Sequence, residues 1–216
     1  MKKLMILVFI LALLFVCGSV MADPSEEPIL FRGIPWQASV TDALQEFNDW
    51  KGYGNGGPSY EYQINGLRDA ERIREIGFAR IVQPGGVNVA GYPVRNIVLQ
   101  FVFSVDEHGL LDRSEENAKY CYAYYEIAEK ETDAVIEDLK FKLSLKYGDI
   151  DETPTDSCNV WWGAEGTVVS LWPDHSWEDN SNRPIYINYS SSGCRQLLVE
   201  AKNALDYEFS LDTEGL

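Results

Sequence analysis

Two stretches of the chain recur in the same order, and this internal echo constrains the fold more than any other feature of the sequence. Residues 41–46 and residues 132–137 both open with Thr-Asp-Ala. Farther on, the Asn-Val pair at residue 88 and the Asn-Val pair at residue 159 each lead through a glycine into an apolar run. The offsets are 91 and 71 residues, so a duplication requires an insertion of about 20 residues in the first copy. The alternative is a chance match of two short segments.

Each copy opens with a pattern typical of an amphipathic helix. Ser39 stands at a helix N-cap position with Asp42 three residues later, as in a capping box. Apolar residues then recur at helical spacing. The same spacing is found in the second copy, where Gly148 predicts the helix end, and again near the C-terminus. The three predicted stripes are Val40, Ala43, Leu44 and Phe47; Ile136, Leu139, Leu143 and Tyr147; and Cys194, Leu197, Leu198, Ala201 and Leu205.

Segments rich in β-branched and aromatic residues follow these helices and predict strands. The predicted strands are residues 96–104, 120–128, 160–162, 167–172 and 184–189. Residues 105–117, between the first two, are polar and predict a hairpin connection. The insertion, residues 49–80, begins with a glycine-rich stretch that has little preference for regular structure, and it ends in a short predicted helix at residues 67–76.

These patterns predict an α+β fold, a tandem repeat of a helix followed by an antiparallel β-meander, with the helices packed on one sheet face. We place a single domain at residues 31–209, divided into repeats at about 31–129 and 130–209. A short linker at residues 23–30 precedes the domain, and a flexible tail at residues 210–216 follows it.

The first 22 residues are typical of a secretory signal peptide. Two lysines precede an apolar run of 13 residues, and Val20-Met21-Ala22 forms a small-residue cleavage site. A membrane anchor is the first alternative, but a bilayer span needs about 20 apolar residues. Lipid attachment at Cys17 is a second alternative, which the bulky Val16 before it disfavours. The sequence therefore predicts a protein that is secreted or held in the extracytoplasmic cell envelope, with no stable membrane insertion after cleavage.

The net charge of the chain is −16, and loss of the two leader lysines makes it −18. Nucleic-acid binding requires clustered cations on the protein, so this charge argues against nucleic acid as a partner. It also argues against docking on anionic lipid.

Three cysteines remain after the leader: Cys121, Cys158 and Cys194. An odd number permits at most one internal disulfide, and the sequence leaves the pairing open. The fold must therefore depend on its hydrophobic core rather than on a disulfide framework.

No residue pattern points to a reaction. The two histidines, His108 and His175, lack the spacing of a zinc helix, and no serine stands in a nucleophile elbow. Residues 149–156 gather four carboxylates, but they lack the glycine and glutamate positions of an EF-hand, so a solvated acidic loop is the simpler interpretation and calcium binding stays open. We predict no catalytic residues, no metal site and no cofactor.

Aromatic residues are the remaining candidates for function, with 6 Trp, 12 Tyr and 9 Phe in the chain. Strand alternation predicts that Tyr120, Tyr122 and Tyr124 share one face while Cys121, Ala123 and Tyr125 share the other. These rings either fill the interface between sheet and helices or act as exposed anchors for a partner. The candidate binding residues are Tyr122, Tyr124, Trp161, Trp162, Trp172 and Trp177.

Residues 31–39, Phe-Arg-Gly-Ile-Pro-Trp-Gln-Ala-Ser, resemble the opening of exported bacterial proteins of unassigned function that carry a Phe-x-Gly-Ile-Pro-Trp-Gly-x-Ser pattern. Gln37 replaces the second glycine of that pattern. The layout of helix then meander, twice over, looks like a tandem version of the small outer-membrane-assembly lipoprotein fold and like β-lactamase inhibitor protein. That resemblance implies a protein-binding role without catalysis.

We therefore expect a non-enzymatic exported protein that binds an unknown extracytoplasmic protein through an aromatic-rich sheet surface. The alternative is a secreted glycan-binding protein or glycan hydrolase that uses a cluster of Trp161, Trp162, Trp172 and Trp177.

Overall fold

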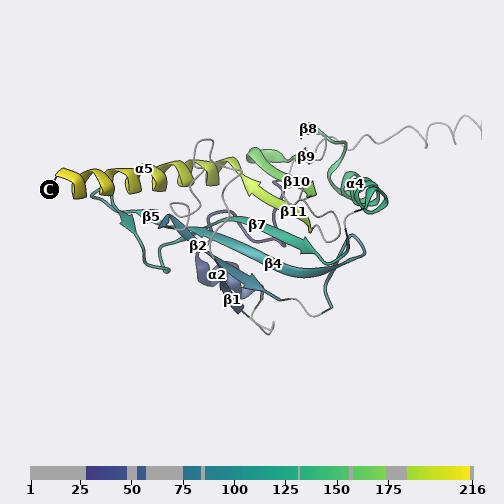
Figure 1. Cartoon of the computed structure of the whole chain (residues 1–216), viewed down its shortest axis with the longest axis horizontal. Helices are drawn as coiled ribbons and strands as arrows, with labels where there is room; N and C mark the ends of the chain where they lie inside the picture. Colours follow the sequence, from purple (N-terminus) through teal and green to yellow (C-terminus); the bar gives the residue numbers. More distant parts are fainter. Residues whose placement is uncertain are drawn as a thin grey trace, which may run out of the picture.

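The computed structural model describes residues 28–47, 53–56, 75–83, 86–130, 132–155, 158–173 and 184–214. In this part of the chain, a mostly antiparallel sheet is combined with three helices, so the predicted α+β class is confirmed (Figure 1). The helices are α2 (Val40–Gln45), α4 (Asp133–Tyr147) and α5 (Ser192–Glu214), with a short 3₁₀ turn, η1, at Ala164–Gly166.

The described strands form one large sheet and one small hairpin. From the first half of the chain come β1 (Tyr53–Gly56), β2 (Gly77–Val82), β3 (Asn88–Val89), β4 (Tyr92–Val102), β5 (Ser104–Val105), β6 (Leu111–Asp112) and β7 (Lys119–Ile127). From the second half come β8 (Glu152–Thr155), β9 (Cys158–Trp162), β10 (Thr167–Pro173) and β11 (Ile185–Ser191). The large sheet has the order β1-β2-β4-β7-β11-β10-β9-β8, with β3 added on β4, whereas β5 and β6 pair only with each other. The last strands of the two halves, β7 and β11, thus lie side by side in the middle of the sheet.

Three of the predicted helices are present, and the predicted residues cap the start of α2 and the end of α4. The short helix predicted at residues 67–76 lies almost entirely outside the described residues. Ser39 caps α2, where its side chain accepts a hydrogen bond from the Asp42 amide. In α4 the buried residues are Ile136, Leu139, Leu143 and Tyr147, which is the predicted stripe. The helix ends at Gly148, whose φ of +91° lies in the region that favours glycine.

The first face of the sheet is covered by α2 and α4. Apolar side chains of both helices belong to one buried cluster with alternate residues of the strands, such as Ile97, Leu99 and Phe101 of β4. The segment before α2 completes this cluster through Phe31 and Ile34. Because these positions alternate along β4, the cluster identifies one face of the sheet.

The second face of the sheet is contacted by α5. Apolar side chains of this helix are buried in a separate cluster, which includes Val102 of β4 and therefore lies on the side of the sheet opposite to Phe101. The members of this second-face cluster are Ile76, Val102, Leu111, Cys121, Tyr122, Cys194, Leu198, Ala201, Ala204 and Leu205. Figure 1 shows α5 and α2 on opposite sides of the sheet. The prediction that the helices pack on one face is therefore wrong for α5. The reason is that α5 follows β11 directly, and its apolar stripe turns toward the face left open by α2 and α4.

A β-bulge in β7 changes the predicted alternation of its tyrosines. The pairing of β4 with β7 shifts between Gln100, which lies opposite Tyr122, and Phe101, which lies opposite Tyr120. The extra residue, Cys121, resets the pattern. Tyr120 consequently lies in the first-face cluster, and Cys121 lies with Tyr122 in the second-face cluster. The expectation that Tyr120 shares a face with Tyr122 and Tyr124 is wrong.

Ile29 and residues 210–214 lie just outside the predicted domain at residues 31–209, and the structure describes both. Ile29, expected in a linker, is buried, and its amide donates a hydrogen bond to Thr167 Oγ1 at 2.7 Å. Residues 210–214, expected in a flexible tail, continue α5. Within the described residues, none of the helices has both the length and the apolar character needed to cross a bilayer.

Candidate functional site

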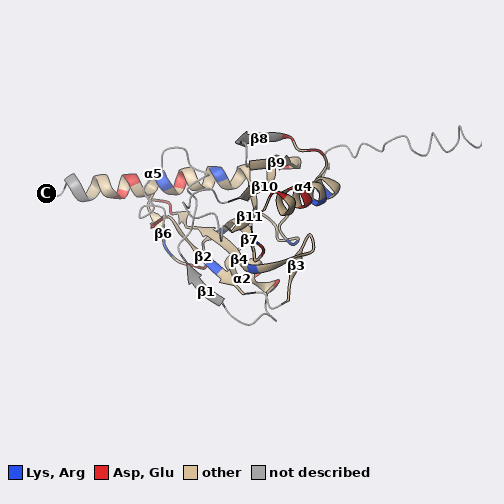
Figure 2. Ribbon diagram, turned by 45° about the vertical axis from the view of Figure 1, so that its right-hand side comes forward, with Lys and Arg blue, Asp and Glu red and all other residues tan. Residues whose placement is uncertain are grey.

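Aromatic side chains collect on the second face of the sheet, away from the part that α5 covers. We use the name aromatic face for Tyr122 and Tyr124 of β7, Tyr186 of β11, Trp172 of β10 and Trp162 of β9. Their backbone pairings place them on the same side: Tyr124 lies opposite Asn188, Tyr186 opposite Trp172, and Trp162 opposite Val168. Strands β9, β10 and β11 contain no charged residue. Figure 2 shows charged residues on α4, on α5 and on the connection from α4 to β8.

The rings in the middle of the aromatic face contact one another. The centroids of Tyr124 and Tyr186 are 5.5 Å apart in an edge-to-face arrangement, and those of Tyr122 and Tyr124 are 6.1 Å apart. The Trp172 indole donates a hydrogen bond from Nε1 to Ser170 Oγ at 2.9 Å. These contacts hold the rings in fixed positions, so they would lose little conformational freedom on binding a partner.

Exposure divides the aromatic face into a covered and an accessible part. Tyr122 is buried beneath α5, whereas Tyr124, Tyr186 and Trp172 are half-buried. Trp162 is the most accessible, with 40% of its surface exposed. Burial, and to a smaller extent the nearby charge of Glu126, raise the pKa of Tyr124 to about 12. The Tyr124 hydroxyl therefore stays protonated at neutral pH and can donate a hydrogen bond.

The predicted tryptophan cluster is not brought together. Trp161 is fully buried in the first-face core, where its Nε1 donates to Ser144 Oγ at 3.3 Å. It cannot contact a partner, because neighbours on a strand point to opposite faces and Trp162 takes the outer one. Trp162 lies opposite Val168 of β10. Val168 and Trp172 are four residues apart on that strand, so Trp162 and Trp172 are separated by about 13 Å along the strand direction. Trp177 lies outside the described residues.

Tyr186 is the member of the aromatic face that sequence reasoning missed. The signal was the alternation in residues 185–189, where isoleucines at 185 and 187 occupy the core face and leave Tyr186 and Asn188 on the other. Aromatic contacts lie on both sides of this strand: Tyr186 contacts Tyr124 on one side, and Tyr189 contacts Phe31 and Tyr125 on the other.

Within the described residues, the other candidates for chemistry do not form a reactive site. His108 lies in the exposed turn of the β5–β6 hairpin, with Nε2 at 3.7 Å from Glu107 Oε1, and His175 lies outside the described residues. The predicted acidic loop contains a strand, β8, and its Asp151 carboxylate accepts a hydrogen bond from the Trp162 amide at 2.7 Å. Among the residues that the structure describes, no three His, Cys, Asp or Glu side chains lie close enough to hold a metal ion.

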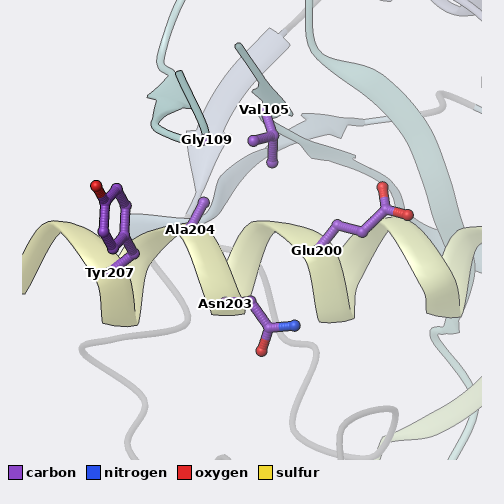
Figure 3. Close-up of a pocket in the computed structure, with 6 residues that line it drawn as sticks. All are labelled: Val105, Gly109, Glu200, Asn203, Ala204 and Tyr207. Atoms are coloured by element: carbon purple, nitrogen blue, oxygen red, sulfur yellow. The ribbon is translucent and has the colours of Figure 1, made fainter. Parts of the chain in front are cut away.

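An open groove of about 410 Å³ lies between the β5–β6 hairpin and α5 (Figure 3). Its lining is mostly apolar or neutral, from Val105, Gly109, Asn203, Ala204 and Tyr207. The one carboxylate in the lining, Glu200, accepts a hydrogen bond from Gln196 on its own helix at 3.0 Å. The groove thus offers shape but no paired acid and base and no nucleophile.

Comparison with known proteins gives this site no further assignment. No protein-family model, no curated protein and no solved structure matches the chain.

Proposed function

We propose that this is a non-enzymatic exported protein that binds another protein outside the cytoplasm through its aromatic face. In this proposal residues 1–22 are a signal peptide that is removed on export, and the mature protein works in the cell envelope or the surroundings of the cell. The binding surface is formed by Tyr124, Tyr186, Trp172 and Trp162.

The observation that carries the proposal is the row of half-buried rings across three neighbouring strands. Tyr124 and Tyr186 pack edge to face, and Trp172 lies directly opposite Tyr186 on the next strand. Rigid tyrosine and tryptophan side chains are enriched among the residues that dominate binding energy at protein interfaces. Their polar atoms, such as the Tyr124 hydroxyl, would fix the orientation of the partner.

The charge of the protein supports a partner with a basic surface. Strands β9–β11 carry no charge, but the mature chain has a net charge of −18. An aromatic contact area that is bordered by the Glu126 carboxylate, opposite Tyr186, and that lies within an acidic molecule attracts a cationic partner at long range and excludes an anionic one. We therefore expect association to slow as salt concentration rises.

The order of the strands supports the tandem-repeat part of the prediction. Four strands of each half run outward from the centre, β7-β4-β2-β1 on one side and β11-β10-β9-β8 on the other. A helix precedes the strands in each half, and α2 and α4 contribute to the same core cluster. This arrangement fits two related units joined at their last strands, as in the tandem folds that the sequence resembles.

The test is affinity capture from envelope and culture fractions with the wild-type protein and two variants of the aromatic face, Trp172→Ala and Trp162→Ala. Phe141→Ala is the matched control, because Phe141 is a highly exposed aromatic residue on α4, away from this face. We expect the Phe141→Ala variant to capture the same partner as the wild type. The amount of this partner captured by Trp172→Ala or Trp162→Ala should be lower by about tenfold or more. The melting temperature of each variant, compared with that of the wild type, tests whether a loss of capture comes from unfolding.

Two outcomes would contradict the proposal. One is that the wild-type protein captures no protein in a larger amount than an unrelated acidic protein does. The other is a partner that binds the Trp172→Ala and Trp162→Ala variants as well as the wild type. Binding to a glycan array that is lost in both tryptophan variants would instead favour the glycan-binding alternative. N-terminal sequencing of the exported protein tests the leader separately, with Asp23 as the expected first residue.

A further inference from the structure

Two of the three described cysteines lie together at the point where α5 meets the central strand. Cys121 is the bulge residue of β7, and Cys194 is in the first turn of α5. Both are fully buried in the second-face cluster. All three described cysteines hold reduced thiols in the structure.

The hydrogen bonds of the two thiols show how closely their backbones approach. The Cys121 thiol donates to the carbonyl oxygen of Cys194 at 3.9 Å, and the Cys194 thiol donates to the carbonyl oxygen of Tyr120 at 3.7 Å. Each sulfur atom therefore reaches the main chain of the other segment. Such a crossed arrangement brings the two side chains toward each other, as a disulfide requires.

Cys158 is not a competing partner. It lies on β9, three strand positions from β7 in the sheet order. At a spacing of about 4.8 Å between strands, Cys158 is about 14 Å from β7 and therefore from Cys121, whereas the Cα atoms of a disulfide lie within about 7 Å of each other. Cys158 is also distant from Cys194. Cys194 follows the end of β11 where Ser191 pairs with Thr167, whereas Cys158 precedes Asn159, which pairs with Leu171 at the other end of β10.

We propose that Cys121 and Cys194 form a disulfide that ties the first turn of α5 to the centre of the sheet. One thiolate attacks a disulfide of the oxidant and releases one of its sulfurs as a thiol. The second thiolate then displaces the other sulfur from the mixed disulfide. The two cysteines lose two electrons and two protons, and the oxidant, a small-molecule or protein disulfide, is reduced to two thiols.

Burial determines when the bond can form. Burial raises the pKa of the Cys121 thiol well above its ordinary value, and the hydrogen bond with the Cys194 side chain raises it further. The thiolate is the attacking species, so the folded, reduced protein reacts slowly. The disulfide therefore forms while the protein folds, before α5 covers Cys121. Once formed, it is protected from reductants by the same burial.

The experiment is oxidative refolding of the full chain, with Cys17→Ser to remove the leader thiol, in a mixture of reduced and oxidised glutathione. Peptide mapping by mass spectrometry should find a Cys121–Cys194 linkage and a reduced Cys158. Since glutathione supplies the oxidant, this outcome does not depend on export or on binding a partner. Recovery of all three thiols reduced, or of a linkage to Cys158, would overturn the proposal.

Thermal unfolding provides a second measurement. The bond would close a loop between residues 73 apart, so reduction should lower the melting temperature by about 10 °C. Cys158→Ser is the matched control and should keep this sensitivity to reductant. Cys121→Ser and Cys194→Ser should each melt at the same temperature with and without reductant. Equal sensitivity in all three variants would also overturn the proposal.

Discussion

Replacement of Phe31 by alanine tests whether the segment before α2 is an integral part of the core. The Phe31 side chain is fully buried on the first face of the sheet. Its ring centroid lies 4.7 Å from that of Tyr125 and 5.1 Å from that of Tyr189. These tyrosines belong to β7 and β11, so Phe31 packs across the junction between the two halves of the chain.

The expected cost follows from this environment. Burial of a phenylalanine side chain contributes about 1.5–3 kcal/mol, and the cavity left by its removal adds to the loss. Two aromatic contacts disappear as well, each of which contributes about 0.5–1.5 kcal/mol in favourable cases. Since these contributions overlap, we expect Phe31→Ala to lower the free energy of unfolding by about 3–5 kcal/mol.

The matched control is the same substitution on the surface. Phe141 lies on α4 with 63% of its surface exposed, and alanine has a higher helix propensity than phenylalanine. We expect Phe141→Ala to change the free energy of unfolding by no more than about 0.5 kcal/mol. Urea unfolding followed by tryptophan fluorescence measures both variants. The reasoning would be refuted by a loss below about 1 kcal/mol for Phe31→Ala, or by equal losses for the two variants.

Two further predictions concern a helix end and an ion pair. Thr132 accepts a hydrogen bond from the Val135 amide at the start of α4, so Thr132→Ala should lower the free energy of unfolding by about 1 kcal/mol in the same assay; an unchanged value would show that the cap contributes nothing. Glu208 accepts hydrogen bonds from the Arg113 guanidinium and from the Leu111 amide, and the Arg113 bond holds the pKa of its carboxyl below the ordinary value. A lowered folded-state pKa contributes stability above the ordinary pKa, and this stability is lost as pH falls through the folded-state value. Glu208→Gln should therefore cost up to about 1 kcal/mol at pH 7 and nothing at low pH, because the pair is partly exposed; a difference that is constant with pH would contradict this.

The helices could be predicted from the sequence because their patterns are long. Over the 15 residues of α4, the four apolar residues of the stripe fall on one side, and all four are buried. The helix ends could also be predicted, because Ser39 and Gly148 satisfy local requirements that depend little on the rest of the fold.

The outer strands could not be predicted. Residues 53–56 read Tyr-Gly-Asn-Gly, which has almost no strand propensity, yet they form β1. Residues 152–155 were predicted to lie in a solvated acidic loop, yet they form β8. Each of these edge strands pairs with one neighbour only, β2 or β9, and its formation depends on that neighbour rather than on its own residues.

The candidate site was predicted in part. Alternation places Tyr122 and Tyr124 on one face, but the bulge at Cys121 moves Tyr120 to the other, and nothing in the local sequence marks a bulge. Alternation also separates Trp161 from Trp162, but only the packing of α4 determines which of the two is inside. Which face of a sheet receives a helix is a tertiary property, so short patterns do not contain it.

The meeting of β7 and β11 at the centre of the sheet has a consequence for how the chain is made. During synthesis, β7 is complete long before residues 185–191 emerge, so the nascent chain carries an open hydrogen-bonding edge over that interval. Intermediates with such an edge pair readily with copies of themselves. Conversely, a chain cleaved between β7 and α4 would yield two fragments with complementary edges, and these fragments should reassemble when mixed.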